Sequence, residues 1–565
     1  MDNFIAEVCL TKRQLSPPPS SLISHIDKAW SSVKSFRART SWIISTTENA
    51  HIDFGKNSND ILWVGGVAQL TNRCGLDRIL TRNGIEPCIS DIQRIAKGFE
   101  LFSSSWFLEL RGLFSVVLLR RSGDVVIVRD QMGLCPFYYF LKKDTVLFSS
   151  DLRALTETGG FSQTLDPVGL AHSVSGEWGD SSRTTWLEIA RLPSGHFLTF
   201  AEDRQRLTDY WAPETRLTIN RDISFRDGVQ HVHDLLQQSV DRYLNTGRAS
   251  LELSGGMDSS SIAGFIANSS KTRQQPVALS WDINDSRSDD PRFANAVVAM
   301  HNFEHHRVPA GASRQSAIDR VIRWRDTPGA FLLDEIERAQ AIAKASGATS
   351  YFTGYIGDAV FGGLEWAAFM EFVLGFDLYR TLKHAFWGRR LAKYSLQVLK
   401  MHPTYIQWNN RLRPQQYDGI IDTELWLAAN LDDQDLDINP FNRDASLEAR
   451  AKLVRLPLHS RNFETMYRIG CESNLATHHP LADVDLVEYI LMLPASFFVG
   501  PPMNRTLESR AAIKFLPKIV QDRRSKGDGT WSAINGILAL NPKMLIKHQF
   551  WLTTVGSTGI ARMLV

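Results

Sequence analysis

The spacing of apolar positions divides the chain into two halves. In the first 200 or so residues the apolar runs are short, and a polar turn such as 122–124 separates one run, 107–120, from the next, 125–128. Further runs of the same kind occupy 137–141 and 145–149. Short apolar runs bounded by turn residues predict an antiparallel strand meander.

The second half has helical spacing. From Phe225 onward apolar residues recur three and four positions apart, and this run leads to a short β-prone stretch at 249–253. A glycine-bearing loop, 254–260, comes next, and a helix-prone stretch, 261–267, follows it. Helix, strand, glycine loop and helix in this order open a doubly wound α/β domain, in which ligands bind at the carboxyl ends of parallel strands.

The loop between these elements reads Ser254-Gly255-Gly256-Met257-Asp258-Ser259-Ser260. Two glycines let the backbone approach an anion, the following helix points N–H groups at it, and Asp258 can hold a divalent cation. The lysine of the GxxxxGK[ST] phosphate loop is absent. An ordinary glycine turn with a capping Ser or Asp is the alternative interpretation. The strand before, the helix after and the complete motif favour phosphate binding.

A second glycine-bearing loop follows the β-prone residues 350–353 and contains Gly354, Gly357 and Asp358. Asp358 is therefore expected at the carboxyl end of another parallel strand, where it and Asp258 can share the magnesium that carries a leaving pyrophosphate. The alternative is that Asp358 only caps a helix beginning near Ala359.

Composition sets bounds on partners and location. A chain of 565 residues with 43% hydrophobic content is expected to form two or more domains. A net charge of +2 argues against a nucleic-acid partner. The five scattered cysteines indicate neither a disulfide framework nor a zinc site, and we found no membrane-spanning apolar run and no basic signal segment. These observations predict a cytoplasmic protein.

The two loops carry a family resemblance. Residues 254–260 resemble the SGGxDSS loop of the ATP pyrophosphatases, and 354–363 resemble the GEGxDExFGG motif of the asparagine synthetase family. Further segments are similar to the same family: 110–114 and 128–139 in its glutaminase-type domain, and 479–483 followed by 493–494, and 510–517 followed by 523–527, in its synthetase domain.

The resemblance implies an α/β fold with two domains. Residues 1–212 are expected to form an Ntn-hydrolase-like, β-rich α+β domain, and 213–565 a doubly wound parallel α/β ATP pyrophosphatase domain with helical C-terminal additions. It also implies that ATP and Mg²⁺ are bound, with Asp258 and Asp358 as the metal ligands. The expected ATP-binding residues are Ser254, Gly255, Gly256, Asp258, Ser259, Ser260, Gly354 and Asp358.

One catalytic residue is implied near the end of the chain. Lys526 matches a family lysine that reaches back into the active site, where a fixed cation would stabilise negative charge. The alternative is a solvated lysine in the basic run 523–526.

Two departures from the family bear on the reaction. Glutamine-dependent members carry a nucleophilic cysteine directly after the initiator methionine, whereas this chain has Asp2 and its first cysteine is Cys9. We therefore expect the N-terminal domain to be an inactive scaffold, and the nitrogen to come from the substrate's own amine. Tyr355 replaces the acidic residue of GEG, as in the β-lactam synthetases, where a tyrosine paired with a glutamate serves as base.

The glutamate of that pair has no direct counterpart. The family position aligns with Ala476, and Glu472, one helical turn earlier, is the candidate replacement. A solvated helix residue is the alternative interpretation of Glu472. A peptide α-amine, with a pKa of about 8, needs little help from a base.

These features favour a macrolactam synthetase of the lasso peptide type, which adenylates a carboxylate of a linear precursor peptide and closes the ring with its N-terminal α-amine. By resemblance, a leader peptidase of the same pathway is an expected partner. A β-lactam or other small-molecule amide synthetase is the first alternative, and a non-catalytic binding module is the second.

Overall fold

The structure is a computed structural model. It describes residues 3–10, 18, 22, 34–37, 41–45, 51–53, 60–158, 161–175, 180–201, 204–244, 247–282, 291–311, 314–326, 333–362, 364–375, 438, 442, 444–499 and 505–523. Asp2 and Lys526 lie outside this part of the chain, so the predictions made for them are not addressed by the structure.

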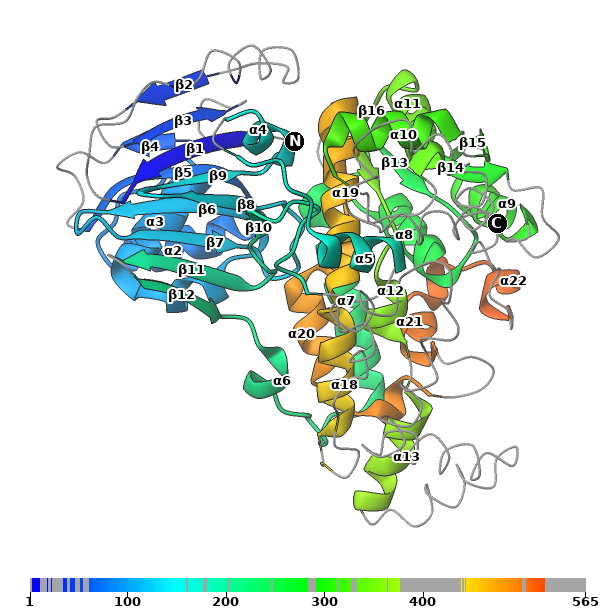
Figure 1. The fold of residues 1–565 in the computed structure, drawn as a ribbon. Coiled ribbons are helices and arrows are strands. Elements are labelled where there is room, and N and C mark those ends of the chain that lie inside the picture. The colour runs from blue at the N-terminus through cyan, green and yellow to red at the C-terminus, as the bar shows by residue number, and fades with distance from the viewer. Residues whose placement is uncertain are drawn as a thin grey trace, which may run out of the picture.

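The N-terminal half contains two six-stranded sheets (Figure 1). One has the order β10-β8-β9-β1-β3-β2 and the other β12-β11-β7-β6-β5-β4, and the pairings between the described strands are antiparallel throughout. The strands are β1 (Phe4–Cys9), β2 (Lys34–Arg37), β3 (Ser41–Ser45), β4 (His51–Asp53), β5 (Ile61–Leu70), β6 (Gly112–Arg120), β7 (Val125–Arg129), β8 (Tyr138–Lys142), β9 (Thr145–Ser149), β10 (Ile189–Arg191), β11 (His196–Ala201) and β12 (Arg204–Asp209). The predicted antiparallel pairings of β6 with β7 and of β8 with β9 are confirmed, but the two hairpins belong to different sheets and do not form one continuous meander.

One predicted strand is too long. The apolar run 107–120 begins as a 3-10 helix, η1 (Ser103–Glu109), and β6 starts only at Gly112. Phe107 is fully buried and stacks on Phe99, so this part of the run packs against a helix instead of pairing with a strand. Hydrophobicity alone does not distinguish these two ways of burying a side chain.

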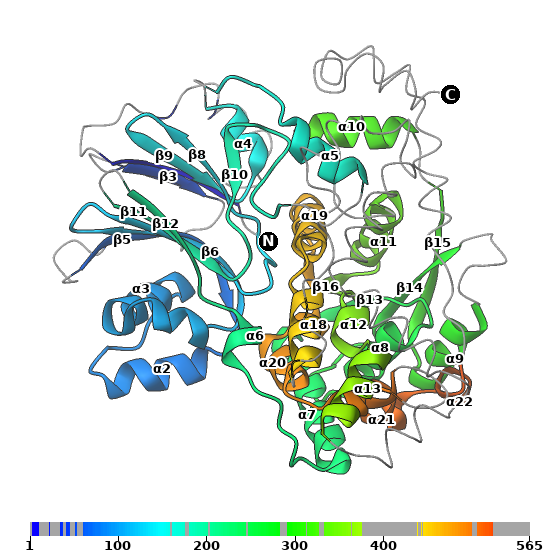
Figure 2. The ribbon, with the colours of Figure 1, turned by 60° about the horizontal axis from the view of Figure 1, so that its bottom comes forward.

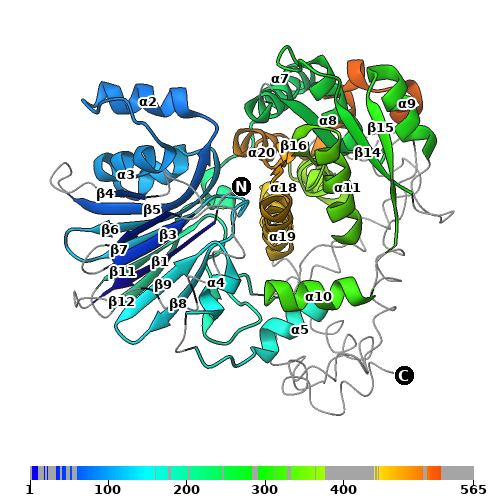
Figure 3. The same cartoon turned by 90° about the horizontal axis from the view of Figure 1, so that it is seen from above.

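Layers of side chains hold the N-terminal domain together. Phe137, Phe148 and Phe200 contribute to a core with residues from both sheets. The helices α2 (Arg73–Arg82) and α3 (Asp91–Phe102) cover the outer face of the β5–β6–β7 sheet, as Figure 3 shows. Helix α3 begins at a cap made by Ser90, whose Oγ accepts a hydrogen bond from Gln93 N at 3.3 Å.

The C-terminal half is built on a five-stranded parallel sheet with the order β15-β14-β13-β16-β17. Its strands are β13 (Arg248–Glu252), β14 (Val277–Asp282), β15 (Glu304–Pro309), β16 (Ala348–Phe352) and β17 (Ala476–His478). The main helices packed around it are α7 (Phe225–Tyr243), α8 (Met257–Asn268), α9 (Pro291–His301), α11 (Leu333–Ala345) and α20 (Val484–Leu491). The expected parallel α/β domain is thus present, with β13 and β16, the strands of the two motifs, adjacent at its centre.

Helical segments complete the C-terminal half. They are α10 (Arg314–Trp324), α12 (Gly357–Phe361), α13 (Glu365–Leu374), α18 (Ala445–Val454), α19 (Pro457–Ser473), α21 (Thr506–Ala511) and α22 (Lys518–Gln521). Helix α19 runs between the antiparallel sheets and the parallel sheet (Figures 1 and 2). Within the described part of the chain, no helix combines the length and the apolar character that a membrane span requires.

Candidate active site

The first loop closes on itself at the carboxyl end of β13. Ser254 Oγ accepts a hydrogen bond from Gly256 N at 3.2 Å, and Ser254 N donates to Ser259 Oγ at 3.3 Å. Helix α8 begins at Met257 after Gly256 and has no side-chain cap, so neither Asp258 nor Ser259 is used to cap it. The geometry leaves the helix N-terminus available for an anion, as expected for a phosphate loop.

The second loop lies directly against the first. A Cβ atom on Gly354 would stand 2.8 Å from Ser259 N, and one on Gly357 would stand 2.1 Å from Asp258 Oδ1. Helix α12 starts at Gly357, so Asp358 lies in its first turn and is not its cap. The two motifs, a hundred residues apart in sequence, therefore form one site.

Alanine at Gly357 tests this close approach. The added methyl group cannot coexist with the Asp258 carboxylate in its present place, and overpacking of this kind costs about 1–3 kcal/mol. We expect Gly357→Ala to weaken the binding of magnesium ATP by about tenfold, measured as the rise of Tm with nucleotide concentration. Gly75→Ala is the control, because its Cβ would meet nothing within 4 Å. An unchanged nucleotide response in Gly357→Ala would contradict the arrangement.

Two carboxylates converge in this site on Arg505. Its Nη1 donates to Asp258 Oδ1 and its Nη2 to Asp358 Oδ1. Arg505 Nη1 also lies 2.9 Å from the Oε2 atom of Glu508, which is fully buried. Burial and the negative charge of Asp258 raise the pKa of Glu508 to about 8, so near neutral pH Glu508 retains its proton for most of the time. Sequence reasoning missed both Arg505 and Glu508.

The arrangement fits a magnesium ion held by Asp258 and Asp358. Both carboxylates reach the same cationic group, and 63% of the Asp358 side chain is exposed, so solvent has access to the position. Oxygen ligands are those that Mg²⁺ prefers. Among the described residues no group of three or more His, Cys, Asp or Glu side chains could hold a metal. The protein would therefore supply two ligands, and water and phosphate oxygens the others.

A second arginine fixes the phosphate loop from the C-terminal side. Arg523 Nη1 donates to the carbonyl oxygen of Gly255 at 2.9 Å, and its guanidinium lies 4.2 Å from the centre of the Phe293 ring. Arg523 opens the basic run that sequence analysis singled out for Lys526. The described part of the chain ends at Arg523, and Lys526 lies outside it.

Tyr355 lies between the second loop and helix α19. Its hydroxyl is 2.9 Å from His459 Nδ1 and accepts a hydrogen bond from Asn462 Nδ2 at 2.6 Å. Because the amide donates to this oxygen, the phenol proton is assigned to the side of His459. Burial raises the pKa of Tyr355 above its usual value and lowers that of His459 to about 4, so both rings are neutral at pH 7.

Glu472 lies elsewhere. It accepts a hydrogen bond from Trp324 Nε1 at 2.8 Å and forms ion pairs with Arg153 and Arg323. Along α19, Glu472 is ten residues from Asn462, or about 15 Å at 1.5 Å per residue. The structure therefore corrects the expectation that Glu472 pairs with Tyr355. His459 and Asn462 share one face of α19 by their spacing of three, but no sequence signal indicates which residue they contact.

Comparisons with known proteins cover both halves of the chain. A family model described as "Asparagine synthase" matches residues 231–531, and one described as "Glutamine amidotransferase domain" matches 82–211. The latter does not extend over the first 81 residues, and the two matches leave 212–230 between them.

Three curated relatives illustrate the range of similarity. "Asparagine synthetase [glutamine-hydrolyzing] 3" of Bacillus subtilis is 22% identical over 439 residues, or 74% of this chain and 66% of that protein. "Amidase chyE" of Penicillium rubens is 27% identical over 295 residues, or 47% of this chain and 43% of that protein. "Amidase chry2" of Gibberella zeae is 25% identical over 184 residues, or 32% and 27% of the two chains. The matched part of the chain thus spans less than two thirds of each of these relatives.

Solved structures give only a distant likeness. The glutamine phosphoribosylpyrophosphate amidotransferase of B. subtilis, solved with ADP and GMP, has a TM-score of 0.27 at 10% identity, with 62% of this chain and 81% of that one covered. The NMN synthetase of Francisella tularensis has a TM-score of 0.17 at 19% identity, with 26% and 58% covered. Scores this low carry no argument about function.

Proposed function

We propose that this chain, which belongs to the asparagine synthase family, forms an amide bond after transferring AMP from ATP to a carboxylate. The observation that carries the proposal is the convergence of Asp258 and Asp358 beside the phosphate loop. An anion-binding loop and two carboxylates suited to magnesium are the requirements for activating a nucleotide phosphate.

The first half-reaction would take place at the phosphate loop. A substrate carboxylate oxygen attacks the α-phosphorus of ATP, and the bond to pyrophosphate breaks with its electron pair. The N-terminus of α8 would bind the phosphate oxygens, and Arg523 would keep the loop in place through Gly255. Magnesium, when bound at Asp258 and Asp358, would neutralise charge on the pyrophosphate.

The second half-reaction would use the pair formed by Tyr355 and His459. An amine attacks the acyl-adenylate carbonyl, and AMP leaves with the electron pair of the broken bond. As the amine loses a proton to the Tyr355 hydroxyl oxygen, the phenol proton would move to His459 Nδ1, 2.9 Å away. Asn462 would hold the phenol oxygen in position by its hydrogen bond.

We further propose that the amine belongs to the molecule that carries the carboxylate, as in a lasso-type macrolactam synthetase acting on a linear precursor peptide. The proposal of an N-terminal domain without glutaminase activity rests on Asp2, which stands where glutamine-dependent members of the family carry a nucleophilic cysteine. A pathway peptidase that removes a leader sequence would then be the partner.

A second candidate is a small-molecule amide synthetase, which includes the β-lactam type. Two relatives are named for amide chemistry without mention of a peptide, as amidases, although less than half of this chain is matched to either. In this case the carboxylate and the amine would belong to a small metabolite.

Mass spectrometry and pyrophosphate release distinguish these candidates. The chain would be incubated with ATP, Mg²⁺, a linear precursor encoded beside its gene and the accompanying peptidase, and in parallel with a panel of free β-amino acids and other small amino acids. We expect AMP, pyrophosphate and a peptide product lighter by one water. Turnover with a small amino acid alone would establish the second candidate. Magnesium ATP binding without AMP release from either set would instead indicate a binding module.

A further inference from the structure

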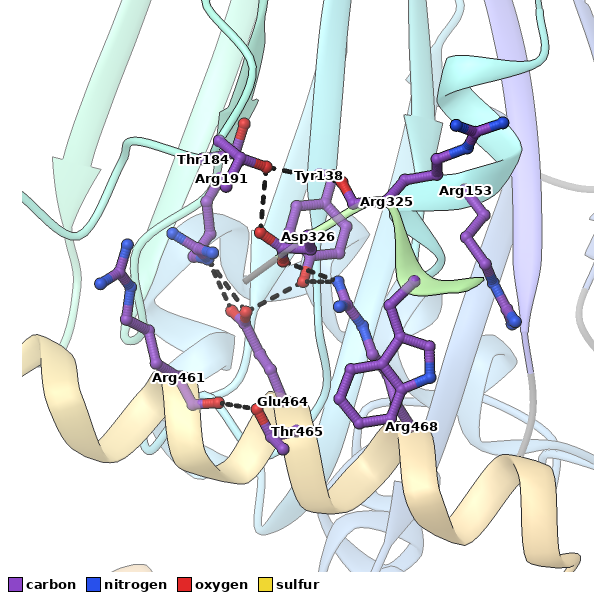
Figure 4. A network of polar contacts seen from close by, with 12 residues as sticks. Tyr138, Arg153, Thr184, Arg191, Arg325, Asp326, Arg461, Glu464, Thr465 and Arg468 are labelled. Atoms are coloured by element: carbon purple, nitrogen blue, oxygen red, sulfur yellow. Dashed lines mark hydrogen bonds and ion pairs between the residues drawn. The ribbon is translucent and has the colours of Figure 1, made fainter. Parts of the chain in front are cut away.

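A buried cluster of charged side chains lies between the two domains, on the face of α19 turned toward the N-terminal sheets (Figure 4). Glu464 is at its centre. Its Oε1 lies 2.8 Å from Arg129 Nη2 and 2.9 Å from Arg191 Nε, and its Oε2 accepts a hydrogen bond from the hydroxyl of Tyr138 at 2.9 Å. The carboxylate is 4% exposed, so these contacts replace water.

The other carboxylates in this region are also paired. Asp326 lies 3.1 Å from Arg468 Nη2, which also donates to Tyr138 Oη at 2.7 Å. Asp151, near the edge of the cluster, is held by Arg153 at 2.7 Å. Around Glu464 and Asp326 there are four arginines, Arg129, Arg191, Arg461 and Arg468, so positive charge is in excess.

Arg461 is the arginine of this group whose guanidinium makes no direct ion pair, although Asp326 and Glu464 attract it from a distance. It precedes Glu464 by one turn of α19, and its side chain extends beside that of Arg191 (Figure 4). No described residue accepts a hydrogen bond from its guanidinium or forms an ion pair with it; its backbone oxygen accepts a hydrogen bond from Thr465 Oγ1 at 3.0 Å. The residue is partly accessible to solvent, whereas Glu464 and Asn462 beside it are buried.

The charge of Arg461 persists despite this setting. Burial and the like charge of Arg191 outweigh the attraction of Asp326 and Glu464 and lower the pKa of Arg461 to about 10, which leaves the guanidinium charged at neutral pH. A partly desolvated charge without a direct partner is unfavourable, and an anion that enters the interface beside Arg461 would reduce the excess of positive charge.

We propose that Arg461 is the receptor of a carboxylate-binding site between the two domains. A guanidinium offers two parallel N–H donors that match the two oxygens of a carboxylate. A phosphate would call for donors on further sides, and among the described arginines of the cluster only Arg461 is uncommitted. The phosphate loop, moreover, is a separate site with arginines of its own, Arg505 and Arg523.

The site is built where a bound acid would contact both domains. Arg191 belongs to β10 of the N-terminal half, and Arg461 belongs to α19 of the C-terminal half. The next residue, Asn462, donates to the hydroxyl of Tyr355. A bound carboxylate would thus lie near the helix that positions Tyr355. The binding itself requires neither ATP nor amide formation.

The test is ligand binding to the full chain in the absence of nucleotide. Sodium propionate would be titrated from 0 to about 100 mM at constant ionic strength, with Tm and calorimetric heat as readouts. We expect a saturable rise of Tm in the natural protein. In Arg461→Gln the affinity should fall by about tenfold or more, the range of a charge-assisted bidentate contact. Arg461→Lys keeps the charge but loses the two parallel N–H donors, so its affinity for propionate should lie between those of the natural protein and Arg461→Gln.

The controls separate a specific site from a general salt effect. Arg78→Gln, on the surface of α2, should respond to propionate as the natural protein does. Sodium chloride and sodium phosphate at equal ionic strength should give no saturable shift that depends on Arg461. A response that survives in Arg461→Gln, a response to phosphate alone, or no response up to the highest concentration would each overturn the proposal.

Discussion

Replacement of Asp258 by asparagine is expected to reduce pyrophosphate release by about 10³-fold or more, since a metal ion at a transferring phosphate contributes several kcal/mol. Asparagine keeps the size of the side chain and still accepts a hydrogen bond from Arg505, but it removes the charge that would hold the cation. The same variant should lose the rise of Tm that magnesium ATP gives to the natural protein.

A surface carboxylate provides the matched control. Asp522 pairs with Lys518 one turn away, and the two side chains are 62% and 78% exposed. Exposed pairs of this kind contribute little, so Asp522→Asn should retain full pyrophosphate release and the full nucleotide response. Asp258→Asn with unchanged activity would remove the basis of the proposed adenylation site.

Glu464→Gln should produce the largest loss of stability. The substitution removes the charge that balances Arg129 and Arg191 inside the domain interface, and breaking a buried ion pair in this way costs about 3–5 kcal/mol. We expect a clear fall in Tm and in the urea midpoint, followed by circular dichroism. Glu448→Gln, which removes a partly exposed pair with Lys452 on α18, should cost about 1 kcal/mol or less.

The pH dependence of stability checks the same interaction. Burial opposes ionisation of Glu464, but Arg191 and Arg129 outweigh it and hold its pKa below the usual value. A carboxylate with a lowered pKa stabilises the fold above its unfolded pKa of about 4.3, and this stabilisation is lost as the pH falls through the folded pKa. Acid should therefore destabilise the natural protein more steeply than Glu464→Gln. The same dependence of stability on pH in the natural protein and in Glu464→Gln would contradict this account of the cluster.

The sequence predicted those parts of the fold that depend on local pattern. The β-prone run 249–253 and the glycine loop after it became β13 and the start of α8, because strand, turn and helix are each specified by neighbouring residues. The same holds for the loop around Asp358. That these two loops meet follows from the placement of parallel strands side by side, which is a rule of the fold class.

The missed residues act over long sequence distances. Arg505 lies 247 residues from Asp258 in the chain, and Asn462 lies 107 residues from Tyr355. Helical spacing places Glu472 on α19, but it does not predict which turn of this helix lies against Tyr355. From sequence, Glu472 is a plausible partner because it lies one turn before the expected position. In the structure, however, the residues that contact Tyr355 lie about three turns earlier on α19, at His459 and Asn462.

Helix α19 also bears on how the domains can be separated. One side of it supplies His459 and Asn462 to Tyr355, and the other places Glu464 and Arg468 among residues of the N-terminal half. Cutting the chain between the halves would leave a strip of mismatched charge on the synthetase part, along the same helix that holds Tyr355. In engineering terms the two halves are not interchangeable modules, and a hybrid would need Tyr138, Arg129 and Arg191 transferred together with α19. A domain of this kind can be retained for the surface it supplies, whatever chemistry it performs.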